Sequence, residues 1–236
     1  MRALLVQHDH VSPPGPLGTR LAERGFEVTE LSVVPAERHR TPDVRCEFPD
    51  PSGWDLVVPM GAPWSVDEPG IASWIRPELR MLAAAHAAGT PVFGVCFGGQ
   101  ALATALGGGV ERAPRPELGW TDVETDDATV VGPGPWFQFH FDRWILPPGA
   151  VEVARSGVSS QAFVRGRSMG VQFHPEITAA QFGLWTRNGA AALMRDRGID
   201  PGTVMAEVRR NEAASVRRTF ALLDAFLDRV SVSPPG

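Results

Sequence analysis

The sequence predicts an α/β fold with a flavodoxin-like open mixed sheet flanked by helices. In the first half of the chain, short apolar segments of strand length alternate with helical stretches, which is typical of a mainly parallel sheet. In the second half, short strand-like segments follow one another across turns rich in Pro and Gly, which indicates antiparallel or mixed pairing. No internal repeat and no linker interrupts this pattern, so we expect one domain over residues 1–236.

Four segments are the expected strands of the first half: Arg2–Gln7, Phe26–Val34, Asp55–Met60 and Pro91–Val95. A short helix to about Arg24 is expected between the first two, because Gly25 can adopt the positive φ that ends a helix. A longer helix ends near Gly89, with Pro77 either at a helix start or at a kink. The segment 35–53 is polar and rich in proline, so we expect a loop there.

Six short segments are the expected strands of the second half: Trp120–Glu124, Thr129–Val131, Trp136–Phe141, Val151–Ala154, Gln161–Val164 and Met169–Phe173. Thr178 is the expected start of a helix, and Gln181 three residues later allows a capping box. A final helix is expected at about 203–230, because its apolar residues recur every three or four positions. We interpret that apolar face as packing on the domain, and a dimer seam is the alternative.

The composition excludes several functions. The formal net charge of −5 argues against a nucleic-acid or anionic-membrane surface, which needs clustered cations. All 22 basic residues are Arg, so neither a Schiff-base lysine nor a phosphate-loop lysine is available. We find no apolar run long enough for a signal peptide or a membrane span, and the two cysteines, Cys46 and Cys96, do not suggest a structural disulfide. We therefore expect a cytoplasmic protein.

Cys96 is the candidate nucleophile. The segment Gly94–Gly98 has the form Gly-x-Cys-x-Gly, the pattern of a nucleophile elbow in which a strand turns sharply into a helix. A cysteine at such an apex sits at a helix N-terminus, where the helix dipole favours a thiolate. The N–H of Phe97 would then point at an oxyanion that forms beside the sulfur. An inert buried cysteine in a Gly-rich turn is the alternative.

The candidate base is His174, at the end of an apolar strand in the tripeptide His174-Pro175-Glu176. Proline favours an extended conformation at the residue before it, and alternate residues of an extended segment face the same side. Glu176 can therefore reach the imidazole and orient it, which completes a series of thiol, imidazole and carboxylate. A surface histidine near a helix start is the alternative.

His8, Asp9 and His10 follow the first strand, at the edge where open α/β sheets bind ligands. Two histidines and one aspartate on a single loop are too few ligands for a metal site, so we expect none. We interpret the segment as a loop at the edge of the active site, and the sequence leaves its role open.

The stretch Gly94-Val95-Cys96-Phe97-Gly98-Gly99-Gln100, with His174-Pro175-Glu176 placed 78 residues after the cysteine, resembles class I (triad-type) glutamine amidotransferase domains. Stand-alone domains similar to the glutaminase part of GMP synthase are the nearest resemblance. The likeness runs from the first strand to about residue 195. The family fold is an open mixed sheet flanked by helices, which agrees with the strand and helix pattern of this chain.

The resemblance implies a role for each matching position. Cys96 would attack the side-chain amide of glutamine and form a thioester. His174 would transfer the protons, and Glu176 would hold the imidazole. The family's oxyanion loop corresponds to residues 60–63 (Met-Gly-Ala-Pro), so the N–H groups of Gly61 and Phe97 would form the oxyanion hole. The implied substrate-binding residues are Gln100, Ser159, Ser160, Gln161, Phe163 and His140. For His140, which would line the mouth of the cleft, a pair with Asp142 that stabilises a turn is the alternative. No cofactor is implied.

Two positions depart from the family pattern. Many relatives carry His at the position of Gly99, which puts assignment to GMP synthase itself in doubt. The oxyanion loop has Ala62 where Gly-Gly-Pro is commoner, and alanine serves there if its φ is negative.

The chain lacks an ATP-pyrophosphatase loop, so ammonia would pass to a separate ATP-dependent synthetase subunit, to another acceptor or to water. Two further hypotheses stay open. One is a γ-glutamyl hydrolase or peptidase with the same triad, acting on a larger substrate in a cleft that Trp64, Trp136 and Trp144 could line. The other is a non-catalytic relative that binds a partner. The sequence does not indicate an oligomeric state.

Overall fold

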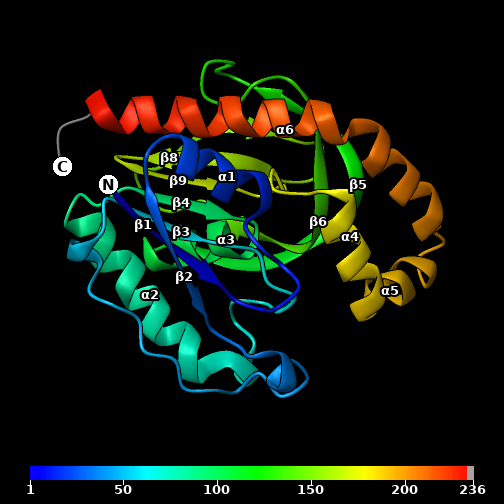
Figure 1. The fold of residues 1–236 in the computed structure, drawn as a ribbon, viewed down its shortest axis with the longest axis horizontal. Coiled ribbons are helices and arrows are strands. Elements are labelled where there is room, and N and C mark those ends of the chain that lie inside the picture. The colour runs from blue at the N-terminus through cyan, green and yellow to red at the C-terminus, as the bar shows by residue number, and fades with distance from the viewer. Residues whose placement is uncertain (233–236) are drawn as a thin grey trace.

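The computed structural model describes residues 1–232, and their backbone is built around a nine-stranded sheet of order β2-β1-β3-β4-β9-β8-β7-β5-β6 (Figure 1). The strands are β1 (Arg2–Gln7), β2 (Glu27–Ser32), β3 (Leu56–Pro59), β4 (Val92–Val95), β5 (Gly109–Thr125), β6 (Gly134–Ile145), β7 (Val151–Arg155), β8 (Ser160–Arg165) and β9 (Ser168–Val171). Strands β2, β1, β3, β4 and β9 pair in parallel, and β9, β8, β7, β5 and β6 pair antiparallel. The predicted open mixed sheet is confirmed.

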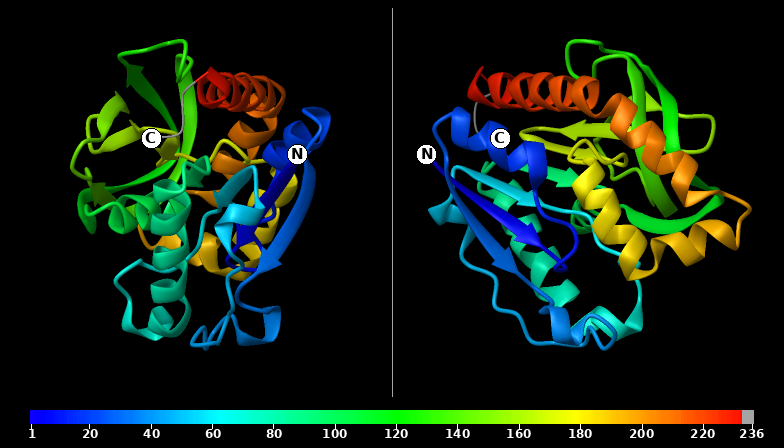
Figure 2. Two further views of the ribbon diagram at one scale, coloured as in Figure 1. Left: turned by 90° about the vertical axis from the view of Figure 1, so that its left-hand side faces the viewer. Right: turned by 45° about the vertical axis from the view of Figure 1, so that its right-hand side comes forward.

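Helices cover both faces of this sheet (Figures 1 and 2). They are α1 (Gly15–Glu23), α2 (Ala72–Ala87), α3 (Phe97–Ala105), α4 (Ala179–Trp185), α5 (Ala191–Arg195) and α6 (Pro201–Val232), with short turns η1 (Ala36–Arg38), η2 (Pro51–Gly53), η3 (Pro69–Ile71) and η4 (Thr186–Ala190). Helices α1 and α6 pack together on one face, and α2 and α3 pack together on the other. The predicted domain extends to residue 236, and residues 233–236 of it lie outside the described part of the chain.

The first strand shows why two layers of helix are needed. Ala3 and Leu5 enter the core beneath α1 and α6, whereas Leu4 and Val6 enter the core beneath α2 and α3. All four side chains are buried, because successive residues of a strand point to opposite faces. A central parallel strand that is apolar at every position therefore requires cover on both sides.

Three local expectations need correction. The segment Thr129–Val131 is a turn and not a strand, because the side chain of Asp127 accepts the N–H of Thr129 at 2.9 Å and closes the chain. Strand β5 begins at Gly109, eleven residues before the predicted start at Trp120. Pro77 lies inside the continuous helix α2 and not at its start.

The C-terminal helix packs on the sheet as expected, and charged side chains tie it to α1. Arg20 donates to both carboxylate oxygens of Asp224, at 3.0 and 2.6 Å, and Arg24 bridges Asp224 and Asp228. The hydrogen bonds from Arg20, and then the charges of both arginines, hold the pKa of Asp224 below its ordinary value even though partial burial opposes this. The cluster links two helices that are about two hundred residues apart in the chain.

We expect Asp224→Asn to lower the free energy of unfolding by about 1 kcal/mol at pH 7, the upper range for a partly exposed ion pair. The pKa of Asp224 is lower in the folded than in the unfolded state, so its contribution is complete above about pH 4 and is lost as the pH falls through the folded pKa. Urea denaturation at several pH values checks this. Asp228→Asn is the control, because Asp228 is exposed and its ion pair within residues 1–232 is with Arg24 alone. An Asp224→Asn deficit that persists at the lowest pH would contradict the assignment.

No helix in residues 1–232 combines the length and the apolar character needed to cross a membrane.

Candidate active site

Parallel pairing of β4 with β9 creates the site. Val95 pairs with Val171, and the N–H of the next residue, Cys96, donates to the Val171 carbonyl at 2.7 Å. The two strands therefore end side by side at the carboxyl edge of the sheet, where open α/β folds bind ligands. Cys96 comes directly after β4, and His174 comes three residues after the end of β9. Two residues that are far apart in the sequence thus meet.

The backbone at Cys96 has the strained geometry of a nucleophile elbow. Cys96 has φ 49° and ψ −108°, and it is the only non-glycine residue with positive φ within residues 1–232. Strain of this kind persists only where the surroundings enforce it. Here they do: a Cβ on Gly98 would lie 2.0 Å from the Pro59 carbonyl oxygen, and one on Gly94 would lie 2.6 Å from the Gly98 oxygen. Only glycine allows β4, α3 and β3 to approach so closely.

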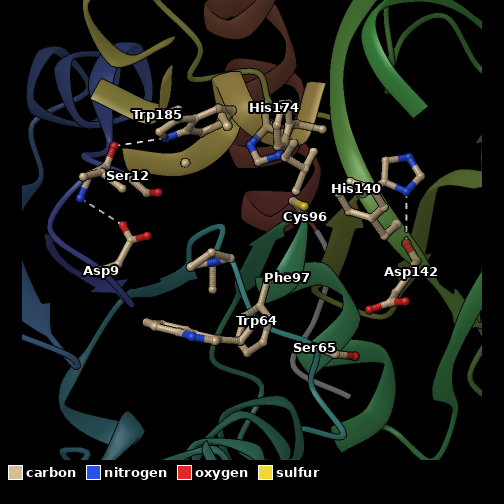
Figure 3. A pocket seen from close by; sticks show the side chains of 18 of the residues that line it. Asp9, Ser12, Trp64, Ser65, Cys96, Phe97, His140, Asp142, His174 and Trp185 are labelled. Carbon is tan, nitrogen blue, oxygen red and sulfur yellow. Dashed lines mark hydrogen bonds between the residues drawn. The ribbon is translucent and has the colours of Figure 1, made fainter. Parts of the chain in front are cut away.

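The imidazole of His174 lies against the Cys96 sulfur, as Figure 3 shows. His174 Nδ1 donates to Glu176 Oε1 at 2.8 Å, and both side chains are buried. Among the described residues, His174 Nε2 makes no hydrogen bond, so this nitrogen is available to the sulfur. Gln172 adds a weak contact, with its Nε2 3.6 Å from Sγ. Thiol, imidazole and carboxylate therefore stand in series.

The electrostatics favour a protonated His174. Burial alone lowers the pKa of His174, but the Cys96 sulfur and then the Glu176 carboxylate outweigh burial and raise that pKa well above its ordinary value. A protonated imidazole beside the sulfur stabilises a thiolate, which is the nucleophilic form of cysteine.

Two residues without a predicted role in the site hold Glu176 and His174 in place. The sequence allows a capping box between Thr178 and Gln181. The Thr178 hydroxyl does accept the Gln181 N–H, but the Gln181 side chain donates to Glu176 Oε1 at 3.5 Å and does not return to Thr178. The Trp185 ring packs edge-on against His174 at 4.9 Å, and its Nε1 donates to the Val11 carbonyl at 3.0 Å. These contacts restrict the orientation of the imidazole and the carboxylate.

The loop after β3 faces the His174 imidazole. A Cβ on Gly61 would lie 3.0 Å from His174 Cε1, so only glycine fits there without displacing the imidazole. The Gly61 carbonyl accepts a hydrogen bond from His8 Nδ1 at 3.3 Å. No peptide bond in residues 1–232 is cis, so the N–H of Ala62, on the same peptide unit, points away from His8. Ala62 lines the cavity in front of Cys96. The N–H groups of Gly61 and Phe97 stay predicted donors to the oxyanion. The orientation of the peptide unit between Gly61 and Ala62 adds the N–H of Ala62 as a third candidate donor.

A cavity of about 440 Å³ opens in front of the sulfur (Figure 3). Trp64, Phe139 and Trp185 form apolar walls, and Cys96 and His174 lie among the lining residues. Gln100 and His140, two of the predicted substrate-binding residues, also line the cavity. Gln100 donates to the Asp142 carbonyl at 2.9 Å and to Gln172 Oε1 at 3.2 Å, so it is already oriented by the protein.

The other predicted substrate-binding residues, Ser159, Ser160, Gln161 and Phe163, are not among the residues that line this cavity. Ser159 and Gln161 donate to the buried Glu117 carboxylate at 3.0 and 2.9 Å, and that carboxylate lies 3.2 Å from His140 Nε2. Burial raises the pKa of Glu117, but the contacts with His140 and the serine hydroxyls outweigh it and lower the pKa. Phe163 packs edge-on against Trp144, and the Ser160 hydroxyl is buried. Their role toward substrate stays a prediction.

The two histidines of the loop after β1, His8 and His10, lie in different surroundings. His8 is fully buried against Glu78, a pairing that no pattern in the sequence indicates, whereas His10 packs against His39 at 5.1 Å. The described part of the chain holds no cluster of His, Cys, Asp and Glu that could bind a metal ion.

The model of the class-I glutamine amidotransferases matches residues 20–186, so the chain belongs to this family. It is 33% identical to a GMP synthase (glutamine-hydrolyzing) of Thermomicrobium roseum over 178 residues, which cover 66% of this chain and 31% of that protein. It is 30% identical to a protein of Saccharolobus solfataricus that is named as one subunit of GMP synthase (glutamine-hydrolyzing), over 145 residues that cover 56% of this chain and 72% of that one. The resemblance to this family is thereby confirmed.

A solved glutamine amidotransferase of Thermotoga maritima superimposes with a TM-score of 0.81 and 25% identity, and the match covers 99% of each chain. One from Methylobacillus flagellatus has a TM-score of 0.80 at 24% identity, covering 96% of this chain and 94% of that one, which supports the fold. The matched segment amounts to only 25–31% of the length of the first GMP synthases that it resembles.

We expect Gly98→Ala to destabilise the protein by about 3 kcal/mol or more, because the new methyl group would meet backbone atoms of Pro59 that cannot move aside. Gly157→Ala is the matched control, because no atom lies within 4 Å of a Cβ there. Urea denaturation of the two variants measures the difference. Equal stability would show that the elbow is not close-packed.

Iodoacetamide at pH 7 is expected to modify Cys96 well before Cys46. His174, whose pKa is raised, lies beside the Cys96 sulfur, whereas burial, followed by Glu78 and Glu47, raises the pKa of Cys46 and disfavours its thiolate. Peptide mass spectrometry over a time course separates the two sites. His174→Ala should slow only the modification of Cys96, and equal rates at both cysteines in the wild-type protein would refute the assignment.

Proposed function

We propose that this chain hydrolyses the side-chain amide of glutamine through a thioester on Cys96 and releases ammonia. The observation that carries the proposal is the buried series of Cys96, His174 and Glu176 at the wall of a cavity. Its family membership supports the same reaction class. The strained elbow supports it further, because backbone strain concentrates where chemistry requires it.

In the first half-reaction, the Cys96 thiolate forms a bond to the amide carbon and the carbonyl oxygen becomes an oxyanion. His174 gives its proton to the amide nitrogen, the C–N bond breaks and ammonia leaves. In the second half-reaction, His174 takes a proton from water while the hydroxide forms a bond to the thioester carbon. The C–S bond then breaks, glutamate is released and the thiolate is restored. Glu176 holds the imidazole in one orientation through both steps.

The oxyanion would be held by backbone N–H groups from two elements. Phe97 provides one at the start of α3, where the helix dipole adds a favourable field. The loop after β3 provides the other, from Gly61 as the sequence predicts or from Ala62 as the peptide plane indicates. One such donor contributes about 2.7–4 kcal/mol to the transition state.

The ammonia acceptor lies outside this chain in our proposal. The chain matches only part of the length of GMP synthases, and one relative carries the name of a GMP synthase subunit. We therefore propose that a separate ATP-dependent synthetase consumes the ammonia. The expected cytoplasmic location fits such a partner.

A γ-glutamyl hydrolase is the second candidate, and the size of the cavity favours it. The lining extends from Cys96 to Trp64, Ser65 and Glu68, which leaves room for a group attached to the amide nitrogen. Parallel kinetics with glutamine, a γ-glutamyl anilide and a γ-glutamyl polyamine distinguish the two. A higher kcat/KM for the larger amides would replace the glutaminase assignment.

We expect wild-type protein to release ammonia from glutamine and Cys96→Ala to lower kcat by at least about 10³-fold. Glu176→Gln should lower kcat by about 10²-fold or more, because it removes the charge that stabilises the imidazolium. A coupled ammonia assay measures both, and Asp224→Asn is the control, because Asp224 pairs with arginines of α1 and does not line the cavity. If Cys96→Ala retains full activity, the chemistry is elsewhere. If an electrophilic glutamine analogue does not label Cys96 in folded wild-type protein, a non-catalytic role is favoured.

A further inference from the structure

A second histidine–carboxylate pair lies beneath the active site, outside the triad. His8 follows β1 and Glu78 comes from α2, and both side chains are 0% exposed. His8 Nε2 lies 2.9 and 3.1 Å from the two oxygens of the Glu78 carboxylate. Such a pair is a poor source of stability, because removing two charges from water costs about as much as their attraction returns. Its placement suggests another use.

Both nitrogens of this imidazole are engaged. Nδ1 lies 3.3 Å from the Gly61 carbonyl oxygen, which can only accept, so Nδ1 carries a hydrogen. Nε2 lies 2.9 Å from Glu78 Oε1, so this nitrogen is paired with the carboxyl group. Burial alone lowers the pKa of His8, but Glu78, the Gly61 carbonyl and Asp9 outweigh burial, so that pKa is raised. His8 therefore donates through Nδ1 to Gly61 while Nε2 is held against Glu78, and the same contacts raise its pKa.

The His8 ring contacts both elements that would hold the oxyanion. Its Nδ1–H is bonded to Gly61 in the loop after β3, and its ring meets the Phe97 ring edge-on at 4.8 Å. Trp74 stacks on the same ring at 5.6 Å, so the imidazole is fixed in position. Gly61 has no side chain to restrict its own backbone, because a Cβ there would press on His174.

The bond from His8 replaces that missing restraint. It fixes the carbonyl of the peptide unit between Gly61 and Ala62, and planarity then fixes the opposite N–H of Ala62 on the cavity side. A donor that is displaced by a fraction of an ångström stabilises the transition state less, while substrate binding is little affected.

We propose that His8, held by Glu78, is a positioning residue that orients the oxyanion loop for catalysis. This inference rests on the proposed glutaminase function. His8 does not touch the reacting atoms in this proposal, and it acts through the Gly61 carbonyl. Glu78 raises the pKa of His8, which favours the charged form and with it a stronger hydrogen bond to that carbonyl.

Two near-isosteric variants separate positioning from general support. His8→Asn keeps an amide group close to the Nδ1 position and can still donate to Gly61, but it leaves Glu78 without its partner. His8→Gln keeps an amide close to the Nε2 position and can still donate to Glu78, but it loses the bond to Gly61. We expect His8→Gln to be the more stable variant in urea and His8→Asn to keep more activity. The expected fall in kcat for glutamine is about 10–100-fold in His8→Gln and under about 5-fold in His8→Asn, with KM changed less than about 3-fold.

Alkylation of Cys96 by iodoacetamide provides the second readout. Alkylation needs the thiolate beside His174 but forms no oxyanion, so its rate in His8→Gln should stay within about 2-fold of wild type while kcat falls. A fall in kcat that follows the order of stability, or a parallel fall in alkylation and hydrolysis, would show a merely structural role and overturn the inference.

The comparison remains decisive if a variant fails to fold. If His8→Asn is insoluble, the split between alkylation and hydrolysis in His8→Gln decides alone. If His8→Gln is insoluble, Glu78→Gln replaces it, and a wild-type kcat in that variant overturns the inference. Wild-type protein that releases no ammonia from glutamine would defeat the proposed function and the inference together. An active wild type whose variants fail these comparisons would defeat the inference alone.

Discussion

The parallel pairing of β4 with β9 is the constraint on which the site depends. These strands come from the two halves of the chain, and their register places Val95 beside Val171. Cys96 and His174 therefore leave the sheet at neighbouring positions of one edge. Because the register is fixed along four residue pairs, a slip of one residue would turn the alternating buried side chains to the wrong face. The stability of the whole sheet thus maintains the distance between sulfur and imidazole.

The glycines around Cys96 convert that pairing into a reactive geometry. Gly98 lets α3 lie against the carbonyl of Pro59, and Gly94 lets the same helix approach β4. This close approach constrains the backbone of Cys96 to a positive φ, and its side chain therefore points away from the sheet. Close packing therefore maintains the strained backbone of Cys96, and Cys96 lies among the residues that line the cavity.

The sequence predicted the fold class and the proposed triad because both depend on local patterns. Apolar runs mark the parallel strands, and Cys96 and Glu176 each lie in a short motif whose geometry follows from backbone rules. It failed where partners are distant or propensities conflict. Pro114 and Pro116 interrupt the strand pattern, yet β5 continues past them through a register shift. His8 meets Glu78 across 70 positions, and no spacing rule reveals such a contact. Val130 and Val131 are buried and β-branched, which is typical of a strand, yet they lie in a turn.

The most direct test of the central claim is the mass of the protein after rapid acid quenching during turnover of glutamine. The account predicts a population heavier by one γ-glutamyl group, with the added mass on the peptide that contains Cys96 and none in Cys96→Ala. Steady release of ammonia, with no adduct on that peptide at any quench time and undiminished turnover in Cys96→Ala, would contradict it.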